Sequence, residues 1–435
     1  MSYLNCKDME KITILGAGLS GLSCAYHFPQ KSVIYEAKDH LGGTASSMQW
    51  QGFTYDYGPH VSFTKDEYIK QLFSKSVNGE FFIKNVLNAN YYQEQWVRHP
   101  AISNLVDFPL KINRDALISF LESRHLEEQK PSNYRDWCEL GQGKFFAENF
   151  THIYTRKFWT VEPEELTYQW AGERVARPSL KRVVDGALGL QQDSGYYYTE
   201  FRYPKVGGYS AYSNFWKDAQ DRIDIQFDHQ ITQIDLKNRV LSFIDKPNAK
   251  FDDILISSLP LPEFVALVPD APEDVRLAAS QLRCTSIALI NIAINEPARV
   301  PYHWFYIYDE KILTPRATIY SNLSEFNAPE GCTSLQAEVP FSSSRPLPTE
   351  NIVERVVDEL ASCGIFNSAK VLNAWQVNLK YGYVIYDVNR EEAINTIHKW
   401  MRTKGVEPVG RFGLWQYLWS DQAVKSGKTL IQSWV

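Results

Sequence analysis

The sequence predicts an α/β protein with a Rossmann-like dinucleotide-binding domain, an inserted helical domain and an antiparallel β-sheet domain. Three observations predict this fold class: a strand–helix–strand pattern around three glycines near residue 16, helical patterns between residues 113 and 154, and successive apolar strands from residue 286 to residue 339. A chain of 435 residues exceeds one ordinary hydrophobic core, so we expect several domains.

The chain opens with a βαβ unit. Residues 12–15 form a short β-branched apolar run, which is typical of a buried parallel strand. A helical stretch follows at residues 19–28, and a second strand is predicted at residues 32–35. The unit ends at Glu36, where an acidic side chain accepts the ribose hydroxyls of an adenine dinucleotide.

Three glycines connect the first strand to the helix in the spacing G-x-G-x-x-G. Gly16 permits a tight turn, and Gly18 lets the backbone approach a pyrophosphate that rests on the helix N-terminus. Gly21 lets the helix pack on the strand. The combination of a strand, the three glycines, a helix and a correctly spaced acidic residue predicts a dinucleotide site far more strongly than the glycines alone.

Composition and charge exclude several other classes of function. Lys and Arg total 45 against 51 Asp and Glu, and a net charge of −6 argues against a nucleic-acid partner. No apolar run approaches the roughly 20 residues of a membrane span, and no signal peptide is evident. The six cysteines are scattered without metal-binding spacing, so we expect no metal, reduced thiols and a cytoplasmic location.

The middle of the chain alternates between predicted helices and strands. Helices are expected at residues 66–77, 113–126, 134–141, 144–154 and 351–363. Strands are expected at residues 81–97, 224–236, 240–243, 286–294, 302–308, 316–322 and 334–339. A further strand at residues 252–260 is expected to return to the dinucleotide-binding sheet.

Several motifs carry a resemblance to known families. The pattern E-A-x-x-x-x-G-G, from Glu36 to Gly43, is similar to that of FAD-binding oxidoreductases of the amine oxidase class. The loop G-P-H at 58–60 and the segments at 154–159, 170–180, 201–208, 316–322 and 410–417 resemble the UDP-galactopyranose mutase family, most clearly its eukaryotic-type branch. The order and spacing of these motifs agree over nearly the whole chain.

The resemblance implies FAD as the cofactor, active in its reduced form. The implied domains are a FAD-binding domain in three parts (1–80, 196–260 and 376–435), a mainly helical domain (81–195) and an antiparallel sheet substrate domain (261–375). Arg411 is expected to contact the FAD pyrophosphate, and the following helix to direct its N-terminus at the isoalloxazine ring. The implied FAD-binding residues are Gly16, Gly18, Gly21, Glu36, Gly42, Gly43, Thr44, Gly58, His60, Arg411, Asp421 and Gln422.

The resemblance also implies an activity, the interconversion of the pyranose and furanose forms of a nucleotide sugar through a reduced FAD N5–sugar adduct. The implied catalytic residues are His60, Arg174 and Arg316, with the two arginines holding the leaving diphosphate. The implied substrate-binding residues are Tyr154, Trp159, Arg174, Tyr306, Arg316, Tyr383 and Tyr417. Implied partners are a nucleotide-diphosphate sugar and a flavin reductant such as NAD(P)H; a homo-oligomer and a role in cell-surface polysaccharide biosynthesis are compatible.

Departures from the family leave alternatives open. Thr155 stands where the family has Asn, and the region from Tyr91 to Leu110 aligns only loosely, so another nucleotide or a 6-deoxy or amino sugar is compatible. Arg177 and the run Tyr196–Tyr198 have no assigned counterpart. The rival hypothesis is an amine oxidase or desaturase-type oxidoreductase, which predicts an apolar substrate cavity, and a third is a binding protein that keeps FAD structurally.

Overall fold

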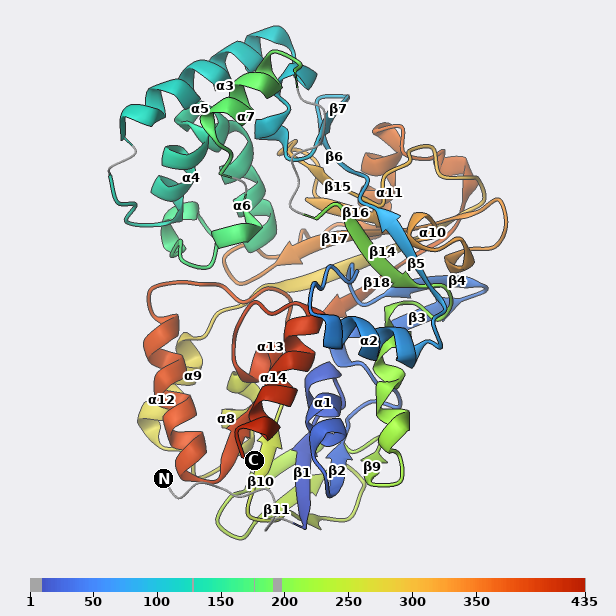
Figure 1. Ribbon diagram of the computed structural model, residues 1–435, viewed down its shortest axis with the longest axis vertical. Helices are drawn as coiled ribbons and strands as arrows, with labels where there is room; N and C mark the ends of the chain where they lie inside the picture. The colour runs from blue at the N-terminus through green and yellow to red at the C-terminus, as the bar shows by residue number, and fades with distance from the viewer. Residues whose placement is uncertain (1–9, 127–128, 176, 191–197, 435) are drawn as a thin grey trace.

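The computed structural model describes residues 10–126, 129–175, 177–190 and 198–434. Figure 1 shows a helical layer at the top, an antiparallel sheet in the middle and the dinucleotide-binding domain below. The expected α/β architecture of three parts is confirmed. Among the described residues, no helix is both long and apolar enough to span a bilayer.

The dinucleotide-binding domain is built on a five-stranded parallel sheet. Its order is β19 (Val406–Pro408), β13 (Leu255–Ser257), β1 (Lys11–Leu15), β2 (Lys31–Tyr35) and β9 (Ile223–Gln226). On β1, Ile14 lies opposite Ile34 of β2 and Ile256 of β13, and all three side chains are fully buried. The apolar run read from the sequence is therefore the centre of this sheet.

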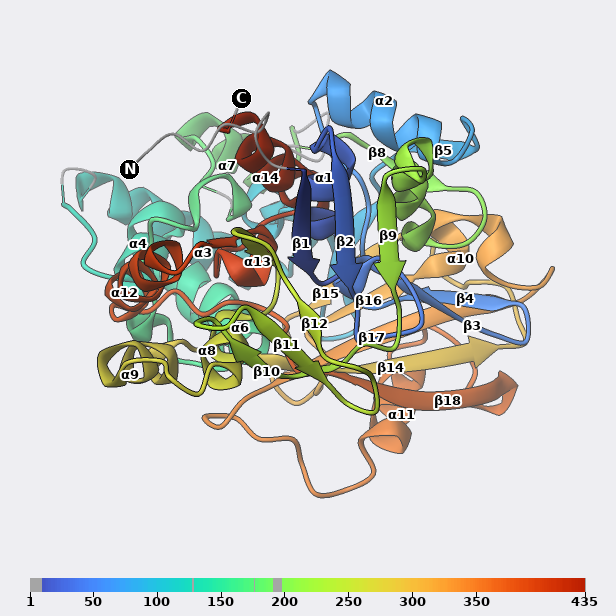
Figure 2. The same ribbon diagram turned by 90° about the horizontal axis from the view of Figure 1, so that it is seen from below.

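Helices and a small second sheet cover the parallel sheet. Helices α1 (Leu19–His27) and α14 (Ser420–Gln432) pack together closely, because a Cβ on Gly427 would lie 2.6 Å from the carbonyl oxygen of Ser20. The other elements of this domain are α8 (Leu261–Leu267), α9 (Glu273–Gln281), α12 (Arg390–Thr403) and α13 (Gly410–Gly413). Figure 2 shows β1, β2 and β9 side by side, with β10 (Ile231–Asp235), β11 (Val240–Phe243) and β12 (Ala249–Lys250) forming a separate antiparallel sheet.

The single strand expected at residues 224–236 is wrong, because the chain leaves the parallel sheet after Gln226. Asp228 has φ +56°, and the His229 N–H donates a hydrogen bond to the carbonyl oxygen of Glu36. This left-handed turn ends β9 and sends β10 into the antiparallel sheet.

The helical layer contains α3 (Leu110–Ser123), α4 (Tyr134–Gln142), α5 (Lys144–Phe146), α6 (His152–Trp159) and α7 (Leu180–Ala187). Gly143, at φ +80°, separates α4 from α5, and a Cβ there would lie 2.5 Å from the backbone nitrogen of Phe120. The expected helix at 144–154 is interrupted by a π-helical turn at Ala147–Thr151. Phe120 and Phe150 are fully buried in the core of this layer.

A seven-stranded sheet, largely antiparallel, separates the two domains. Its order is β18 (Val371–Leu379), β14 (Ser286–Ile294), β17 (Thr333–Phe341), β16 (Arg316–Ile319), β15 (Trp304–Ile307), β6 (Asn88–Tyr92) and β7 (Gln95–Arg98), with β15 and β6 parallel. Helix α11 (Ile352–Ser362) buries Val356 and Leu360 in the apolar cluster on one face.

Strand β16 is shorter than predicted. The strand expected at 316–322 ends at Ile319, and α10 (Tyr320–Leu323) follows it. Ala317 and Ile319 belong to the apolar cluster under α11, so Arg316 and Thr318 lie on the opposite face of the sheet.

Shorter elements link the sheet to the dinucleotide-binding domain. They are the pair β3 (Ser47–Trp50) and β4 (Phe53–Asp56), helix α2 (Glu67–Ser76), and the pair β5 (Phe81–Asn85) and β8 (Glu200–Pro204). Asp66 begins α2 as predicted, because its carboxylate accepts the N–H groups of Tyr68 and Ile69.

Candidate functional site

The glycine turn after β1 holds a carboxylate beside the backbone. Gly16 has φ +95°, and the Ala17 N–H donates a hydrogen bond of 2.7 Å to Glu36 Oε2. The Lys38 N–H donates to the other carboxylate oxygen of Glu36 at 3.0 Å. The acid at the end of β2 thus lies against the turn, where a dinucleotide's ribose would sit.

The second glycine pair lies directly against this turn. The Gly42 N–H donates to the carbonyl oxygen of Ala17 at 3.0 Å, and a Cβ on Gly43 would lie 3.1 Å from the Cα of Gly18. Gly42 and Gly43 have φ of +99° and +59°, which favour glycine. Two backbone loops therefore come together at the N-terminus of α1.

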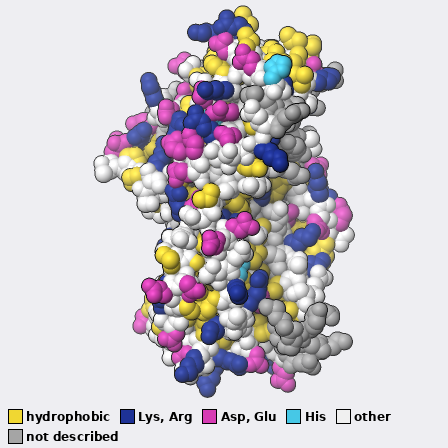
Figure 3. Space-filling model, turned by 90° about the vertical axis from the view of Figure 1, so that its left-hand side faces the viewer, with side chains coloured by type: hydrophobic (Ala, Val, Ile, Leu, Met, Phe, Trp, Pro, Cys, Tyr) yellow, Lys and Arg dark blue, Asp and Glu magenta, His cyan; other side chains and the backbone are white. Residues whose placement is uncertain are grey.

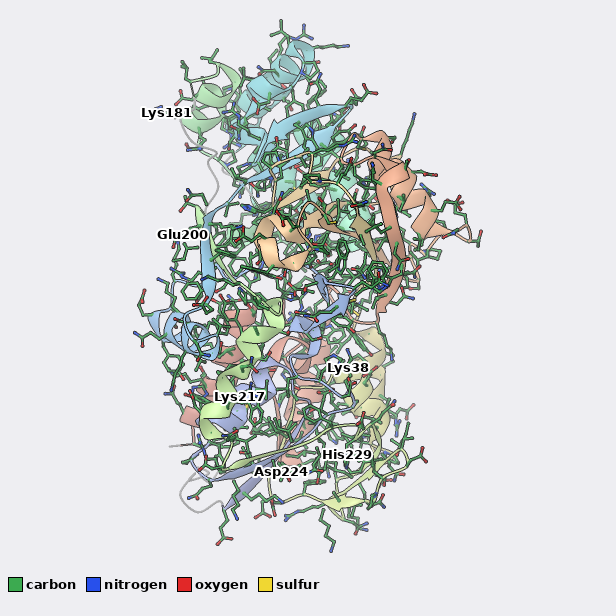
Figure 4. The ribbon with its side chains drawn as sticks, turned by 90° about the vertical axis from the view of Figure 1, so that its right-hand side faces the viewer. Lys38, Lys181, Glu200, Lys217, Asp224 and His229 are labelled. Carbon is green, nitrogen blue, oxygen red and sulfur yellow. The ribbon has the colours of Figure 1, made fainter. Side chains whose placement is uncertain are left out.

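These loops form one wall of a cavity of about 480 Å³, which we call the dinucleotide cavity. Such a volume is typical of small-molecule and cofactor sites. Of the residues predicted to bind the cofactor, it is lined by Gly16, Gly18, Glu36, Gly42, Gly43, Thr44, His60 and Arg411. Lys38, labelled in Figure 4, also lines this cavity, and its ammonium lies 4.6 Å from the centre of the Tyr57 ring.

A second cavity of about 250 Å³, the arginine cavity, adjoins the first. The two form one continuous site, because they share the lining residues Thr44, His60, Leu379, Tyr381, Arg411, Phe412, Leu418, Trp419 and Ser420. Ser420 and Asp421 at the N-terminus of α14 line the arginine cavity, and their helix end favours negative charge there. Gln422 is exposed and instead accepts the N–H of Trp419 at 2.9 Å.

Arg316 and Glu338 form a buried ion pair in the wall of the arginine cavity. Both guanidinium Nε and Nη2 of Arg316 donate to the carboxylate of Glu338, the second at 3.0 Å. The Tyr383 hydroxyl donates to Glu338 Oε1 at 2.7 Å. Glu338 is 1% exposed, so the cavity wall contains a buried carboxylate next to the arginine predicted to hold the diphosphate.

Two further arginines in this cavity bind only backbone carbonyls and aromatic rings among the described residues. Arg174 donates to the carbonyl oxygen of Tyr417 at 2.6 Å and stacks over the Tyr417 ring at 4.7 Å. Arg411 donates to the carbonyls of Leu418 and Gly382, while its buried Nε has no partner in the part of the chain that the structure describes. Both positive charges are therefore available to an anion.

His60 lies between the two cavities. Its ring Nδ1 is 2.8 Å from the carbonyl oxygen of Gly58, and its ring contacts that of Tyr209. Burial, with a smaller contribution from charge repulsion by Arg411 and Arg316, lowers the pKa of His60 to about 4. The imidazole is therefore neutral near pH 7, with its Nδ1–H donating to Gly58.

This low pKa predicts a pH-dependent stability. Unfolded His60 gains a proton below about pH 6.5, whereas the folded protein resists protonation down to about pH 4. The free energy of unfolding should therefore fall between pH 6.5 and pH 4 more steeply in the wild type than in His60→Gln. Urea unfolding at several pH values measures this difference, and parallel curves for the two proteins would contradict it.

Two residues predicted to contact the nucleoside lie behind the cavity wall. Tyr154 is enclosed by Phe158, Tyr306 and Tyr308, and its burial holds its pKa well above the usual range. Trp159 is 5% exposed and packs against Trp170, Tyr383 and Tyr417. Neither lines the arginine cavity, so a ligand confined to that cavity would not contact these rings.

The other predicted substrate residues, Arg174, Tyr306, Arg316, Tyr383 and Tyr417, all line the arginine cavity. The lining residues that the sequence reasoning missed include Phe63, Trp304, Thr318, Glu338 and Trp419. One signal for Glu338 was available, because a lone acidic residue interrupts the apolar strand from Thr333 to Phe341. Residues 191–197, which include Tyr196 and Tyr197, lie outside the described residues.

Comparison with solved structures shows the fold. A crystal structure of reduced UDP-galactopyranose mutase superposes with a TM-score of 0.92 at 23% identity, covering 98% of this chain and 93% of that one. Putrescine oxidase bound to putrescine gives a TM-score of 0.62 at 12% identity, covering 97% and 98%. The chain therefore has the fold of the FAD-dependent amine oxidase-like superfamily.

Sequence comparison gives a different group of relatives. A family model for an NAD(P)-binding Rossmann-like domain matches residues 14–76. A 4,4'-diaponeurosporene oxygenase of Staphylococcus aureus is 19% identical over 424 residues, covering 83% of this chain and 82% of that protein. The same enzyme of Staphylococcus haemolyticus is 33% identical over 57 residues, which span 12% of this chain and 11% of that protein.

FAD is the cofactor of this superfamily, and the residues of the site fit it. Glu36 is placed for the adenosine ribose, and the N-terminus of α1 with Gly18 and Gly43 for the pyrophosphate. The orphaned Nε of Arg411 is a donor for an anionic group between the two cavities. No cluster of His, Cys, Asp and Glu among the described residues could hold a metal ion.

Proposed function

We propose that this protein is a flavin-dependent mutase that interconverts the pyranose and furanose forms of a nucleotide sugar. One observation carries the proposal: three arginines line a cavity that continues from the dinucleotide cavity and faces the N-terminus of α14. A leaving diphosphate needs such concentrated positive charge. The likeness of the fold to a UDP-galactopyranose mutase supports the same reading.

The chain's own residues bind and orient the substrate. Arg174 and Arg316 hold the diphosphate as it leaves the sugar and returns, the Tyr417 hydroxyl donates to it, and Arg411 lies beside the cofactor. Reduced FAD, when bound, supplies through N5 the nucleophile for the sugar's anomeric carbon. His60, which is neutral, lines the site where the isoalloxazine ring would lie and adds no charge there.

Glu338 has two consequences for this site. Its bidentate contact fixes the guanidinium plane of Arg316, so one edge of that arginine is occupied and the other is directed at the substrate. Its negative charge also offsets that of Arg316, which leaves Arg174 and Arg411 as the main source of attraction for a diphosphate.

A second candidate function is an oxidase or oxygenase that acts on an apolar substrate. The curated relatives, named as diaponeurosporene oxygenases and matched over most of the chain, favour it. Arg174 and Arg411 argue against it, because an apolar substrate would enclose their charges without a carboxylate partner among the described residues, which is costly.

An anaerobic assay of dithionite-reduced enzyme with a panel of nucleotide sugars tests the two candidates. We expect isomerised sugar nucleotide, with no net oxidation or reduction, only when the flavin is reduced. Consumption of oxygen or another acceptor in proportion to product would instead support the oxidase. Purified protein that carries no flavin would contradict both.

The remaining proposals concern the protein's context. An NAD(P)H-dependent reductant, a homo-oligomer, a cytoplasmic location, a role in polysaccharide biosynthesis and the domain boundaries given above stay predictions. Figure 3 shows Lys and Arg side chains interspersed with Asp and Glu over the left-hand face, which fits the expectation of no nucleic-acid partner on that face.

A further inference from the structure

We propose that one end of the arginine cavity, lined mostly by aromatic rings, selects a sugar with a methyl group in place of a hydroxymethyl group, a 6-deoxyhexose. This end, which we call the aromatic end, is formed by Phe63, Tyr198, Trp304, Leu323 and Trp419 around Thr318. The inference rests on the proposed function and adds the class of sugar to it.

Four aromatic rings enclose this end. Phe63 lies at its centre, with ring-centre distances of 4.6 Å to Tyr198, 6.0 Å to Trp304 and 6.1 Å to Trp419. The Trp304 indole N–H already donates to the Tyr306 hydroxyl at 3.1 Å. The walls therefore present mostly ring faces and edges, which favour C–H groups and a methyl over a hydroxyl.

Strand β16 sets the distance between the charged and the aromatic ends. Arg316 and Thr318 lie on the same face, and alternate residues of a strand are about 7 Å apart. Thr318 lies opposite Trp304 in the register of β15 and β16. A phosphate held at Arg316 therefore places the far side of an attached sugar ring beside Thr318 and Trp304.

Thr318 offers the aromatic end a single hydroxyl. Its side chain is 1% exposed, and its Oγ1 has no hydrogen-bond partner among the residues that the structure describes. Leaving a buried hydroxyl unpaired costs about 1–3 kcal/mol, so this group is suited to one ring hydroxyl of the ligand. A hydroxymethyl group would place a second hydroxyl against aromatic rings that offer it no further hydrogen bond from Thr318, whereas a methyl group has no hydroxyl to satisfy.

The test compares two sugars on one nucleotide, UDP-galactose and UDP-fucose in the D configuration, with anaerobically reduced holoenzyme. We expect kcat/KM to be about 10–100-fold higher for the 6-deoxy sugar, the range that a hydrophobic pocket achieves against an added hydroxyl. Equal or higher kcat/KM for UDP-galactose would overturn this inference without contradicting the proposed mutase function. Failure to isomerise or bind any nucleotide sugar would instead overturn the proposed function, and this inference with it.

Variants locate the preference within the cavity. Phe63→Tyr adds a hydroxyl at the aromatic end and should reduce the ratio of kcat/KM between the 6-deoxy sugar and galactose. Phe326→Tyr, whose exposed ring lines neither cavity, should leave this ratio unchanged. Thr318→Val should weaken binding of both sugar nucleotides about tenfold in calorimetry, and Thr318→Ser should restore it. A Thr318→Val protein that binds both sugars like the wild type, with an unaltered flavin spectrum, would contradict the role of Thr318.

Discussion

Replacing Arg316 by alanine should lower the turnover of the reduced enzyme by about 10²–10³-fold, the effect typical of removing one donor to a developing negative charge. Arg316 lies in the cavity wall, and its guanidinium is fixed by Glu338 and contacts the Tyr383 hydroxyl. The protein should keep its FAD, because the dinucleotide cavity does not include Arg316. Steady-state kinetics and flavin absorbance measure the two effects separately.

The same substitution leaves Glu338 buried without its partner. Removing one member of a buried ion pair costs about 3–5 kcal/mol, so Arg316→Ala alone could lose activity by unfolding. The double variant Arg316→Ala/Glu338→Gln removes the stranded charge and should recover stability but not turnover. Recovery of turnover along with stability would show that Arg316 acts only on the fold.

Arg174 provides a comparison that avoids this difficulty. It is exposed, and among the described residues it contacts only the carbonyl of Tyr417 and the rings of Tyr417 and Trp419. Arg174→Ala should therefore fold normally while binding nucleotide sugars more weakly and turning them over more slowly. Unchanged kinetics in both arginine variants would remove the diphosphate clamp from the proposal.

The parts of the site that sequence reasoning reached are local in the chain. The turn from Gly16 to Gly21 and the acid Glu36 form one βαβ unit, whose glycine spacing and strand lengths already define its geometry. The fold class followed from such local patterns together with the order of the motifs.

The aromatic end could not be predicted in this way. Its residues come from six segments, the loop after β4, the residues before β8, strands β15 and β16, helix α10 and the loop before α14, and no periodicity connects them. Similarly, the family resemblance indicated that Tyr154 and Trp159 would contact the substrate. Their position outside the lining of the arginine cavity depends on how the helical layer packs on the sheet. Which residues line the cavity therefore depends on long-range packing, which the local motifs do not specify.

Alanine at Gly21 should abolish stable FAD binding. A Cβ there would lie 2.0 Å from the carbonyl oxygen of Gly16 and 3.3 Å from Ile14 Cγ2, and a backbone oxygen cannot move aside as a flexible side chain would. Helix α1 must then shift away from β1, which separates its N-terminus from the second glycine loop at Gly43. We expect purified Gly21→Ala to contain less than about a tenth of the wild-type flavin, because the pyrophosphate loses both its turn and its helix end.

Gly364→Ala is the matched control for this prediction. Gly364 has φ +75° with nothing within 4 Å of the added Cβ, so alanine there introduces backbone strain of about 1–2 kcal/mol but no collision. Its flavin content should equal that of the wild type, with a slightly lower melting temperature. Full flavin occupancy in Gly21→Ala would mean that α1 tolerates the shift, and that Glu36, Arg411 and the second glycine loop hold the cofactor without the close contact between helix and strand.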